Sequence, residues 1–357
     1  MEYYKKTCYI SVNIIIFSLY YEPVIMEQLL KVENLSVAFA SGKKNLEVVS
    51  GLSFSLKRGE VLALVGESGC GKSASCLALT GLLPSPPASS NADRILFSVG
   101  KNIEDLNKIS ARKLRKIRGG KIAYVFQEPA ASLNPVIRIG DQIAEVIALH
   151  RPEIKDYKAE IISLLSQVGI PSPETRINSY PHELSGGMQQ RVMIAMALAG
   201  NPDLLIADEP TTALDVTVQA QILDLIDKIR KEREMAVILI SHNLGVVSQL
   251  ADRIIVMYAG IMVESGSAED ILKRAAHPYT KALISAVPEL GRKCGRLNTI
   301  PGAVPSPGEF PAGCRFSNRC QSAIDGVCAY KRPEEKNISR THSVSCHLFS
   351  ESSGDVK

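Results

Sequence analysis

The eight residues 66–73 restrict the chain to few folds. They follow a short apolar run at 61–65, and a helical pattern starts near Lys72. Between a strand and a helix, the pattern glycine, four variable residues, glycine, lysine and serine forms a loop whose backbone N–H groups surround a phosphate. The lysine of this pattern reaches the β- and γ-phosphates, and the serine hydroxyl binds Mg²⁺. A glycine-rich turn that binds nothing is the alternative, which the flanking strand and helix disfavour. The expected phosphate-binding residues are Gly66, Glu67, Ser68, Gly69, Cys70, Gly71, Lys72 and Ser73.

Strand and helical patterns alternate over most of the chain. Apolar runs that suit strands lie at 30–37, 61–65, 122–126, 204–207, 237–240 and 254–258. Helical patterns lie at 141–149, 159–168, 189–199 and 218–232. This alternation, with glycine at strand ends, predicts an α/β fold with a sheet rich in parallel strands. We expect loops at 84–91 and in the proline- and glycine-rich run 301–313, and the second is the clearest domain boundary.

Two adjacent carboxylates follow the apolar strand at 204–207. Asp208 and Glu209 therefore lie at the carboxyl end of a strand, where ligands of open α/β sheets bind. A solvated strand end would explain the pair alone, but a phosphate loop in the same chain favours catalysis. We expect Asp208 to hold Mg²⁺, directly or through water, and Glu209 to polarise a water for attack on the γ-phosphate.

A second glycine-rich segment, residues 184–189, opens a predicted helix and lies in the sequence between the phosphate loop and the acidic pair. This segment resembles the signature sequence of ATP-binding-cassette (ABC) ATPases. Together with the motifs above, it extends the resemblance to this family from about residue 30 to residue 267. It includes Gln127 after the strand at 124–126, the turn 213–215 and His242 after the strand at 237–240. It implies a P-loop NTPase core of ABC type with an inserted helical subdomain at about 130–190. The signature residues are Leu184, Ser185, Gly186, Gly187, Met188 and Gln189.

The resemblance implies catalytic roles for Lys72, Glu209 and His242, the last as a switch at the γ-phosphate. A structural histidine would otherwise be the default interpretation of His242. Gln127 is implied to couple the nucleotide site to the helical subdomain and to join Ser73 and Asp208 as a ligand of Mg²⁺. In this family two cassettes face each other head to tail, so that each signature binds the ATP of the partner cassette. Dimerisation is therefore implied to be part of the mechanism.

Two more residues receive roles from the resemblance. Phe39 is expected to stack on the adenine of ATP, the alternative being an ordinary buried phenylalanine of a strand. Asp215 belongs to the family's D-loop. The family usually has aspartate after the switch histidine, whereas this chain has Asn243.

Further motifs resemble the ATPase subunits of bacterial dipeptide, oligopeptide and nickel importers. The stretch that starts with His277 opens the C-terminal extension typical of that subfamily. The resemblance implies a peripheral ATPase on the cytoplasmic face of the inner membrane that energises peptide import. Its implied partners are a second ATPase subunit, homologous or identical, two transmembrane permease subunits and an extracytoplasmic substrate-binding protein. Nickel or glutathione import remains open. The motifs lie at 126–129, 132–135, 180–184, 277–280, 282–283 and 287–288.

Two rival functions come from other classes. A soluble ABC ATPase acting on DNA or the ribosome typically carries two cassettes or a long coiled-coil insertion, and this chain shows neither. A redox-sensing regulator with a vestigial cassette is the second rival. The intact Lys72, Asp208 and Glu209 argue against it.

The motifs divide the chain into an extension at 1–25, an ABC ATPase domain at 26–270 and a C-terminal extension at 271–357. Residues 7–21 are uncharged and follow two lysines, but no small-residue cleavage site comes after them. Met26 as the true first residue is the leading interpretation, with a disordered extension or a membrane-surface anchor as alternatives. No run reaches the roughly 20 apolar residues that cross a bilayer as a helix.

Residues 291–357 differ in composition from the rest of the chain. They hold five of the eight cysteines and 10 basic against 6 acidic side chains, while residues 1–290 hold 31 of each. Gaps of five, seven and seventeen residues between four of these cysteines do not supply the close pairs of zinc sites. Disulfides are rare in the cytosol. Some members of the peptide-importer subfamily hold a four-iron four-sulfur cluster through cysteines here, and the resemblance implies such a centre. Zinc and reduced structural thiols are the alternatives. The implied ligands are Cys314, Cys320, Cys328 and Cys346.

Other side chains near these cysteines carry expectations too. Arg315 and Arg319 are expected to compensate the charge of the cluster or to be solvated. We expect no nucleic acid as partner, because interleaved aromatic residues are lacking. His342 and His347 are expected at the surface, the alternative being that they substitute as ligands of the cysteine centre. In the phosphate loop, a thiol at a helix N-terminus can have a lowered pKa, so that oxidation of Cys70 is a hypothesis for control of ATP binding.

Overall fold

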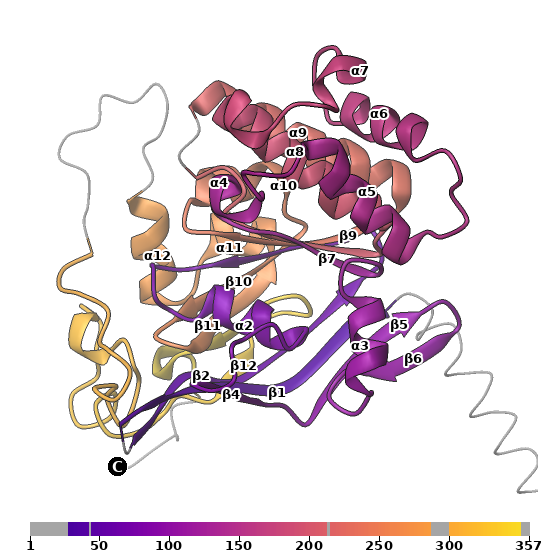
Figure 1. Cartoon of the computed structure of the whole chain (residues 1–357). Coiled ribbons are helices and arrows are strands. Elements are labelled where there is room, and N and C mark those ends of the chain that lie inside the picture. Colours follow the sequence, from indigo (N-terminus) through magenta and orange to yellow (C-terminus); the bar gives the residue numbers. More distant parts are fainter. Residues whose placement is uncertain (1–27, 43, 213–214, 287–299, 351–357) are drawn as a thin grey trace, which may run out of the picture.

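The computed structural model describes residues 28–42, 44–212, 215–286 and 300–350, which form two sheets with helices packed around them (Figure 1). The main sheet has the strand order β12-β13-β11-β10-β3-β9-β8-β7. Its five strands from β10 to β7 are parallel, and β11, β13 and β12 continue it in antiparallel fashion. The bounds are β3 (Val61–Val65), β7 (Ile122–Val125), β8 (Leu204–Asp208), β9 (Ala236–Ser241), β10 (Arg253–Tyr258), β11 (Ile261–Ser267), β12 (Glu335–Asn337) and β13 (Ser343–Ser345).

The second sheet is antiparallel and has the order β2-β1-β5-β6, with β4 also paired to β1. In Figure 1 it lies below the main sheet. Its strands are β1 (Gln28–Ser41), β2 (Lys44–Lys57), β4 (Ala88–Asn91), β5 (Arg94–Val99) and β6 (Asn102–Asp105).

Helices connect the strands of the main sheet. The phosphate loop separates α2 from β3. The segment between β7 and β8 forms α4 to α8, of which α6 and α7 lie at the top of Figure 1. Within the described ranges, no helix has the length and the apolar content to span a membrane. The helices are α2 (Lys72–Leu79), α3 (Ala111–Ile117), α4 (Pro129–Ser132), α5 (Ile139–His150), α6 (Tyr157–Gln167), α7 (Pro173–Arg176), α8 (Gly186–Ala199), α9 (Val216–Arg233), α10 (Leu244–Leu250), α11 (Ala268–Arg274) and α12 (Pro278–Ser285), with 3-10 turns η1 (Pro181–Glu183), η2 (Ser317–Arg319) and η3 (His347–Phe349).

The five parallel strands of the main sheet are largely buried, and β3 shows how both of their faces are covered. Along β3, Val61, Ala63 and Val65 belong to one apolar cluster, which also contains residues of α5, α6, α8 and α9. Leu62 and Leu64 belong to a second cluster, shared with β1, β2 and β5. A strand covered on both faces is apolar at every position. This is why the run at 61–65, which precedes the phosphate loop, is apolar at every position.

The predicted α/β fold with parallel strands is confirmed, and the six predicted strands are present with end points shifted by a few residues. The loop expected at 84–91 is wrong in its last four residues, which form β4 and pair with β1. The surface positions expected for His342 and His347 are also wrong, since both side chains are buried.

The C-terminal extension joins the main sheet. β13 pairs with β11, where Glu264 lies opposite Val344. Glu264 is fully buried, and its carboxylate lies 2.7 Å from the ring nitrogen Nε2 of His342. It also accepts hydrogen bonds from the backbone N–H groups of Ala276 and His277. A buried carboxylate needs such partners, which explains why His342 is held inside.

Candidate nucleotide-binding site

A cavity of about 780 Å³ opens where β3, β8 and β9 end. Seven of the eight residues of the predicted phosphate loop line it, all except Cys70. Phe39 reaches it from β1, and Gln127, Glu209 and His242 reach it from the ends of the neighbouring strands. The structure therefore brings together most of the residues that the sequence indicated. The remaining lining residues are Val48, Ala74, Thr212 and Leu283.

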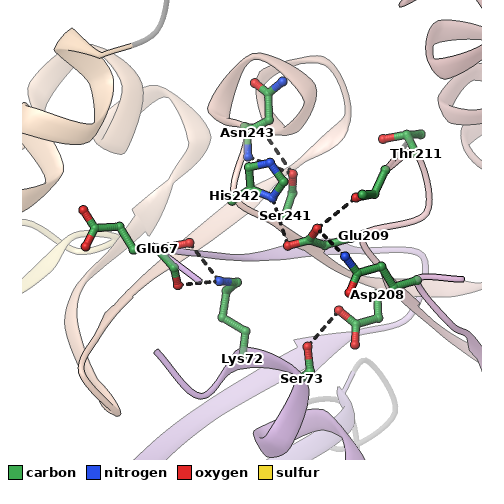
Figure 2. Close-up of polar contacts among 12 residues, drawn as sticks. Glu67, Lys72, Ser73, Asp208, Glu209, Thr211, Ser241, His242 and Asn243 are labelled. Atoms are coloured by element: carbon green, nitrogen blue, oxygen red, sulfur yellow. Dashed lines mark hydrogen bonds and ion pairs between the residues drawn. The ribbon is translucent and has the colours of Figure 1, made fainter. Parts of the chain in front are cut away.

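The phosphate loop follows a tight path that glycine permits. The φ angles of Gly69 and Gly71 are 78° and 97°, in the left-handed region. A Cβ on Gly66 would lie 2.2 Å from the carbonyl oxygen of Met257. The ammonium of Lys72 is buried and donates to the carbonyl oxygens of Gly66 at 2.8 Å and Glu67 at 2.9 Å (Figure 2). The loop therefore holds a positive charge at the start of α2.

Asp208, at the end of β8, contacts the loop through Ser73. The Ser73 hydroxyl donates to Oδ1 of Asp208 at 3.0 Å, and the Tyr124 hydroxyl donates to Oδ2 at 3.0 Å. Burial raises the pKa of Asp208, against the opposing hydrogen bonds from Ser73 and Tyr124. A hydroxyl and a carboxylate oxygen side by side are the hard oxygen ligands that Mg²⁺ prefers, so this donor pair fits the expected ion. Tyr124 was missed because it precedes the motif that drew attention to Gln127.

Glu209 points into the cavity and is held at both carboxylate oxygens (Figure 2). Oε1 lies 2.9 Å from Nδ1 of His242, and Oε2 accepts from the Thr212 hydroxyl at 2.9 Å and from Nε2 of Gln127 at 3.2 Å. Its φ of 45° is unusual for a residue with a side chain and costs about 1 kcal/mol or more. Strain of this kind persists where the surrounding contacts fix a functional group.

The same contacts decide the protonation of Glu209. Burial would raise its pKa, but hydrogen bonds from His242 and Thr212, with the charges of His242 and Lys72, outweigh burial and hold it below the usual value. The carboxylate is therefore ionised at neutral pH, as a general base must be. Thr212 was not predicted. The signal was a hydroxyl residue three positions after Glu209 in the same turn.

Asn243, which replaces the family's usual aspartate, caps α10. Its side chain accepts from the backbone N–H of Gly245 at 2.9 Å. Asparagine and aspartate cap helices equally well. The departure from the family pattern therefore keeps the cap of the helix that follows His242.

Cys70 lies beneath the loop rather than in the cavity. Its side chain is fully buried, and burial raises the pKa of the thiol above its usual value although Lys72 opposes the shift. The hypothesis of a lowered pKa is wrong, because the desolvation of the thiolate outweighs the helix N-terminus and the lysine. Control of ATP binding through a reactive Cys70 thiolate loses its basis.

The signature residues lie at the start of α8, and none of the six lines the cavity described above. The Ser185 hydroxyl accepts from the backbone N–H of Met188 and caps the helix. The Gln189 amide donates to the carbonyl oxygens of Pro181 at 2.9 Å and Leu184 at 3.2 Å. Within the D-loop, Asp215 caps α9 through the backbone N–H groups of Thr217 and Val218, while 213–214 lie outside the described residues.

The four predicted cluster cysteines gather in the C-terminal extension. Burial, together with the charges of the Cys328, Cys346 and Cys320 thiolates, raises the pKa of Cys314 to about 11. In the part of the chain that the structure describes, however, no group of three or more histidine, cysteine or acidic side chains is arranged to hold a metal ion. The iron–sulfur and zinc interpretations therefore lack structural support. Cys294 lies outside the described residues.

Comparisons with known proteins agree with this geometry. A family model described as "ABC transporter" matches residues 49–212, and one described as "Oligopeptide/dipeptide transporter, C-terminal region" matches residues 263–328. The dipeptide transport ATP-binding protein DppD of Bacillus subtilis is 47% identical over 90% of this chain and 95% of its own length. DppD of Escherichia coli is 45% identical over 89% and 96%. Among solved structures, the ATP-binding cassette MJ0796, a dimer bound to ADP and phosphate, superposes with a TM-score of 0.58 at 26% identity, over 67% of this chain and 99% of that one.

Proposed function

Because this chain belongs to the ABC ATPases, within the family of peptide-importer ATP-binding subunits, we propose that it hydrolyses ATP to energise import of dipeptides or oligopeptides across the bacterial inner membrane. One observation carries the proposal. A cassette match and a match to the C-terminal region of oligopeptide/dipeptide transporters occur in the same chain, in the same order as in the sequence motifs. This combination favours transport over the rival roles on DNA or the ribosome.

The residues that line the cavity or contact its lining suit separate roles in the binding and hydrolysis of ATP. We propose that the phosphate loop and Lys72 bind the β- and γ-phosphates and that Phe39 stacks on adenine. Ser73 and Asp208, with Gln127, would hold Mg²⁺, which when bound neutralises charge on the phosphates. Glu209 would accept the proton of the attacking water.

The remaining predicted residues sense the γ-phosphate or contact the ATP of a partner subunit in this proposal. His242, hydrogen-bonded to Glu209 and exposed on its other side, would sense the γ-phosphate. The signature residues 184–189 and Asp215 would face the ATP of a second ATPase subunit. Because the signature does not line the cavity of its own chain, a dimer is needed to complete each site.

Assembly follows from the same proposal. Helices α4 to α8, the proposed helical subdomain, would pass the closing motion to two permease subunits, and an extracytoplasmic binding protein would deliver the peptide. The chain would then work on the cytoplasmic face of the membrane as a peripheral subunit. We retain the division into 1–25, 26–270 and 271–357 as part of this proposal.

Uptake by cells tests the substrate. A host strain without its own dipeptide and nickel importers receives this chain together with the two permease subunits, the binding protein and the second ATPase subunit that the proposal requires. We expect uptake of a labelled dipeptide to be restored and uptake of radioactive nickel or of glutathione to stay at background. Restored nickel or glutathione uptake without peptide uptake would overturn the peptide proposal and favour the alternative importers.

The cysteine centre is a separate proposal, supported only by the gathering of four thiols and the subfamily resemblance. If Cys314, Cys320, Cys328 and Cys346 hold a four-iron four-sulfur cluster, the full chain purified without oxygen should contain about four iron atoms and absorb visible light. Replacing Cys328 by serine should reduce both. A colourless, iron-free wild-type protein would overturn the cluster, and zinc analysis of the same sample would then separate a zinc site from reduced structural thiols.

A further inference from the structure

Arg319, in the C-terminal extension, holds the second residue of the phosphate loop. Its guanidinium grips the Glu67 carboxylate with two bonds, Nη1 to Oε2 at 2.7 Å and Nη2 to Oε1 at 3.1 Å. The two residues are 252 positions apart in sequence. Only 7% of the Arg319 side chain is exposed. A two-bond contact of arginine with carboxylate fixes the orientation of both groups, so the loop is tied to the extension at this point.

Other contacts fix both partners of this pair. The Glu67 backbone N–H donates to the hydroxyl of Tyr279 in α12 at 2.9 Å, and its carbonyl oxygen accepts from Lys72. Every polar group of Glu67 is therefore bonded, and two of its partners come from the part of the chain after residue 271. Figure 2 shows the Glu67 carboxylate pointing away from Lys72.

Arg319 is itself held by the loop that precedes it. It donates to the carbonyl oxygens of Pro301 at 2.8 Å, Gly302 at 3.2 Å and Ile300 at 3.4 Å. The hydrogen bonds with Glu67 raise the pKa of Arg319 above an already high value, so the guanidinium is permanently charged. The solvated positions considered for Arg315 and Arg319 are wrong, because both side chains are buried. Both contact the cassette, since Arg315 pairs with Glu47 of β2.

The ion pair between Arg319 and Glu67 matters for nucleotide binding because Glu67 is negatively charged. Glu67 lines the same cavity as Lys72 and Ser73, and an unpaired carboxylate there would repel a triphosphate. Paired with Arg319, the carboxylate contributes no net charge and is directed away from Lys72. Leu283 of α12 also lines the cavity, so the extension contributes to the site at more than one place.

We infer that Arg319 is a positioning residue of the nucleotide site, which cancels the charge of Glu67 and directs it out of the phosphate-binding region, so that the C-terminal extension takes part in nucleotide binding. The inference concerns binding of nucleotide and goes beyond the proposed transport function. It also places the cysteine-bearing segment next to the loop, because Cys320 follows Arg319 directly.

A double-mutant cycle tests the inference on the full chain with Mg·ADP as the probe. Arg319→Met is expected to raise the Kd for Mg·ADP about tenfold, because a lost charge-assisted pair leaves the carboxylate unpaired. The KM for ATP should rise with it while kcat stays near the wild-type value. Arg319→Met combined with Glu67→Gln is expected to recover most of the affinity, since no charge then needs cancelling.

Two controls separate this role from mere support of the fold. Arg332→Met removes the same charge from an exposed position of the extension and should leave the Kd unchanged. Arg319→Lys keeps the charge and should be weakened less than Arg319→Met. If Arg319→Met binds Mg·ADP as wild type does, or if Glu67→Gln brings no recovery in a folded double variant, the inference fails. Because no peptide enters this assay, its failure would leave the transport proposal standing.

Discussion

Replacing Glu209 by glutamine is expected to lower kcat for ATP hydrolysis by about a hundredfold or more while ATP still binds. Glutamine keeps the length of the side chain and can still accept from Thr212, so the geometry is largely preserved. It cannot take a proton from water. Contacts with His242, Thr212 and Gln127 hold the wild-type carboxylate ionised and oriented. The glutamine variant lacks this ionised carboxylate.

Phosphate release at saturating ATP measures kcat, and equilibrium binding of ATP measures the affinity. Glu145→Gln, an exposed carboxylate on α5, is the matched control and should hydrolyse ATP like wild type. A Glu209→Gln protein that retains a kcat close to wild type would show that another group accepts the proton.

Replacing Lys72 by methionine is expected to weaken the binding of ATP, in addition to any effect on the turnover of bound ATP. The ammonium is buried and makes two hydrogen bonds to loop carbonyl oxygens. In the nucleotide complex these donors are expected to turn to the phosphates, and two charge-assisted bonds are worth about 3 kcal/mol together. We therefore expect the Kd for Mg·ATP to rise about a hundredfold.

Methionine fills nearly the same volume as lysine, so the test variant should fold. Circular dichroism and thermal unfolding check this. Lys116→Met, exposed on α3, removes an equal charge elsewhere and should bind as wild type does. Unchanged nucleotide affinity in a folded Lys72→Met protein would contradict the role of the loop.

Local patterns predicted the five parallel strands of the main sheet well because each of them is short, apolar and largely buried, whereas β11, β13 and the charged, exposed β12 were not predicted. The same patterns predicted the antiparallel sheet poorly. β1 and β2 are 14 residues long, and their register shifts at several points, including the stretch from Val32 to Val37. Bulges of this kind interrupt the period-two alternation by which a strand is recognised. Only the segment 30–37 of β1 was predicted.

The residues of the site also fall into those that local patterns predicted and those that they did not. Motif residues such as Lys72, Glu209 and His242 were found because their spacing is local. Contacts between distant segments were not, as with Tyr124 and Asp208, 84 residues apart, or Arg319 and Glu67. The pKa of Cys70 was predicted in the wrong direction because the local helix end is visible in the sequence and the burial is not.

Accumulation of a labelled dipeptide in reconstituted vesicles tests the central claim most directly. The vesicles contain the permease subunits, with this chain, its ATPase partner and ATP enclosed, and the binding protein and dipeptide outside. The account predicts that the wild-type chain drives accumulation above the outside concentration and that Glu209→Gln, with ATP bound, does not. Hydrolysis of ATP by the wild-type chain without any accumulation of peptide, or equal accumulation with Glu209→Gln, would contradict it.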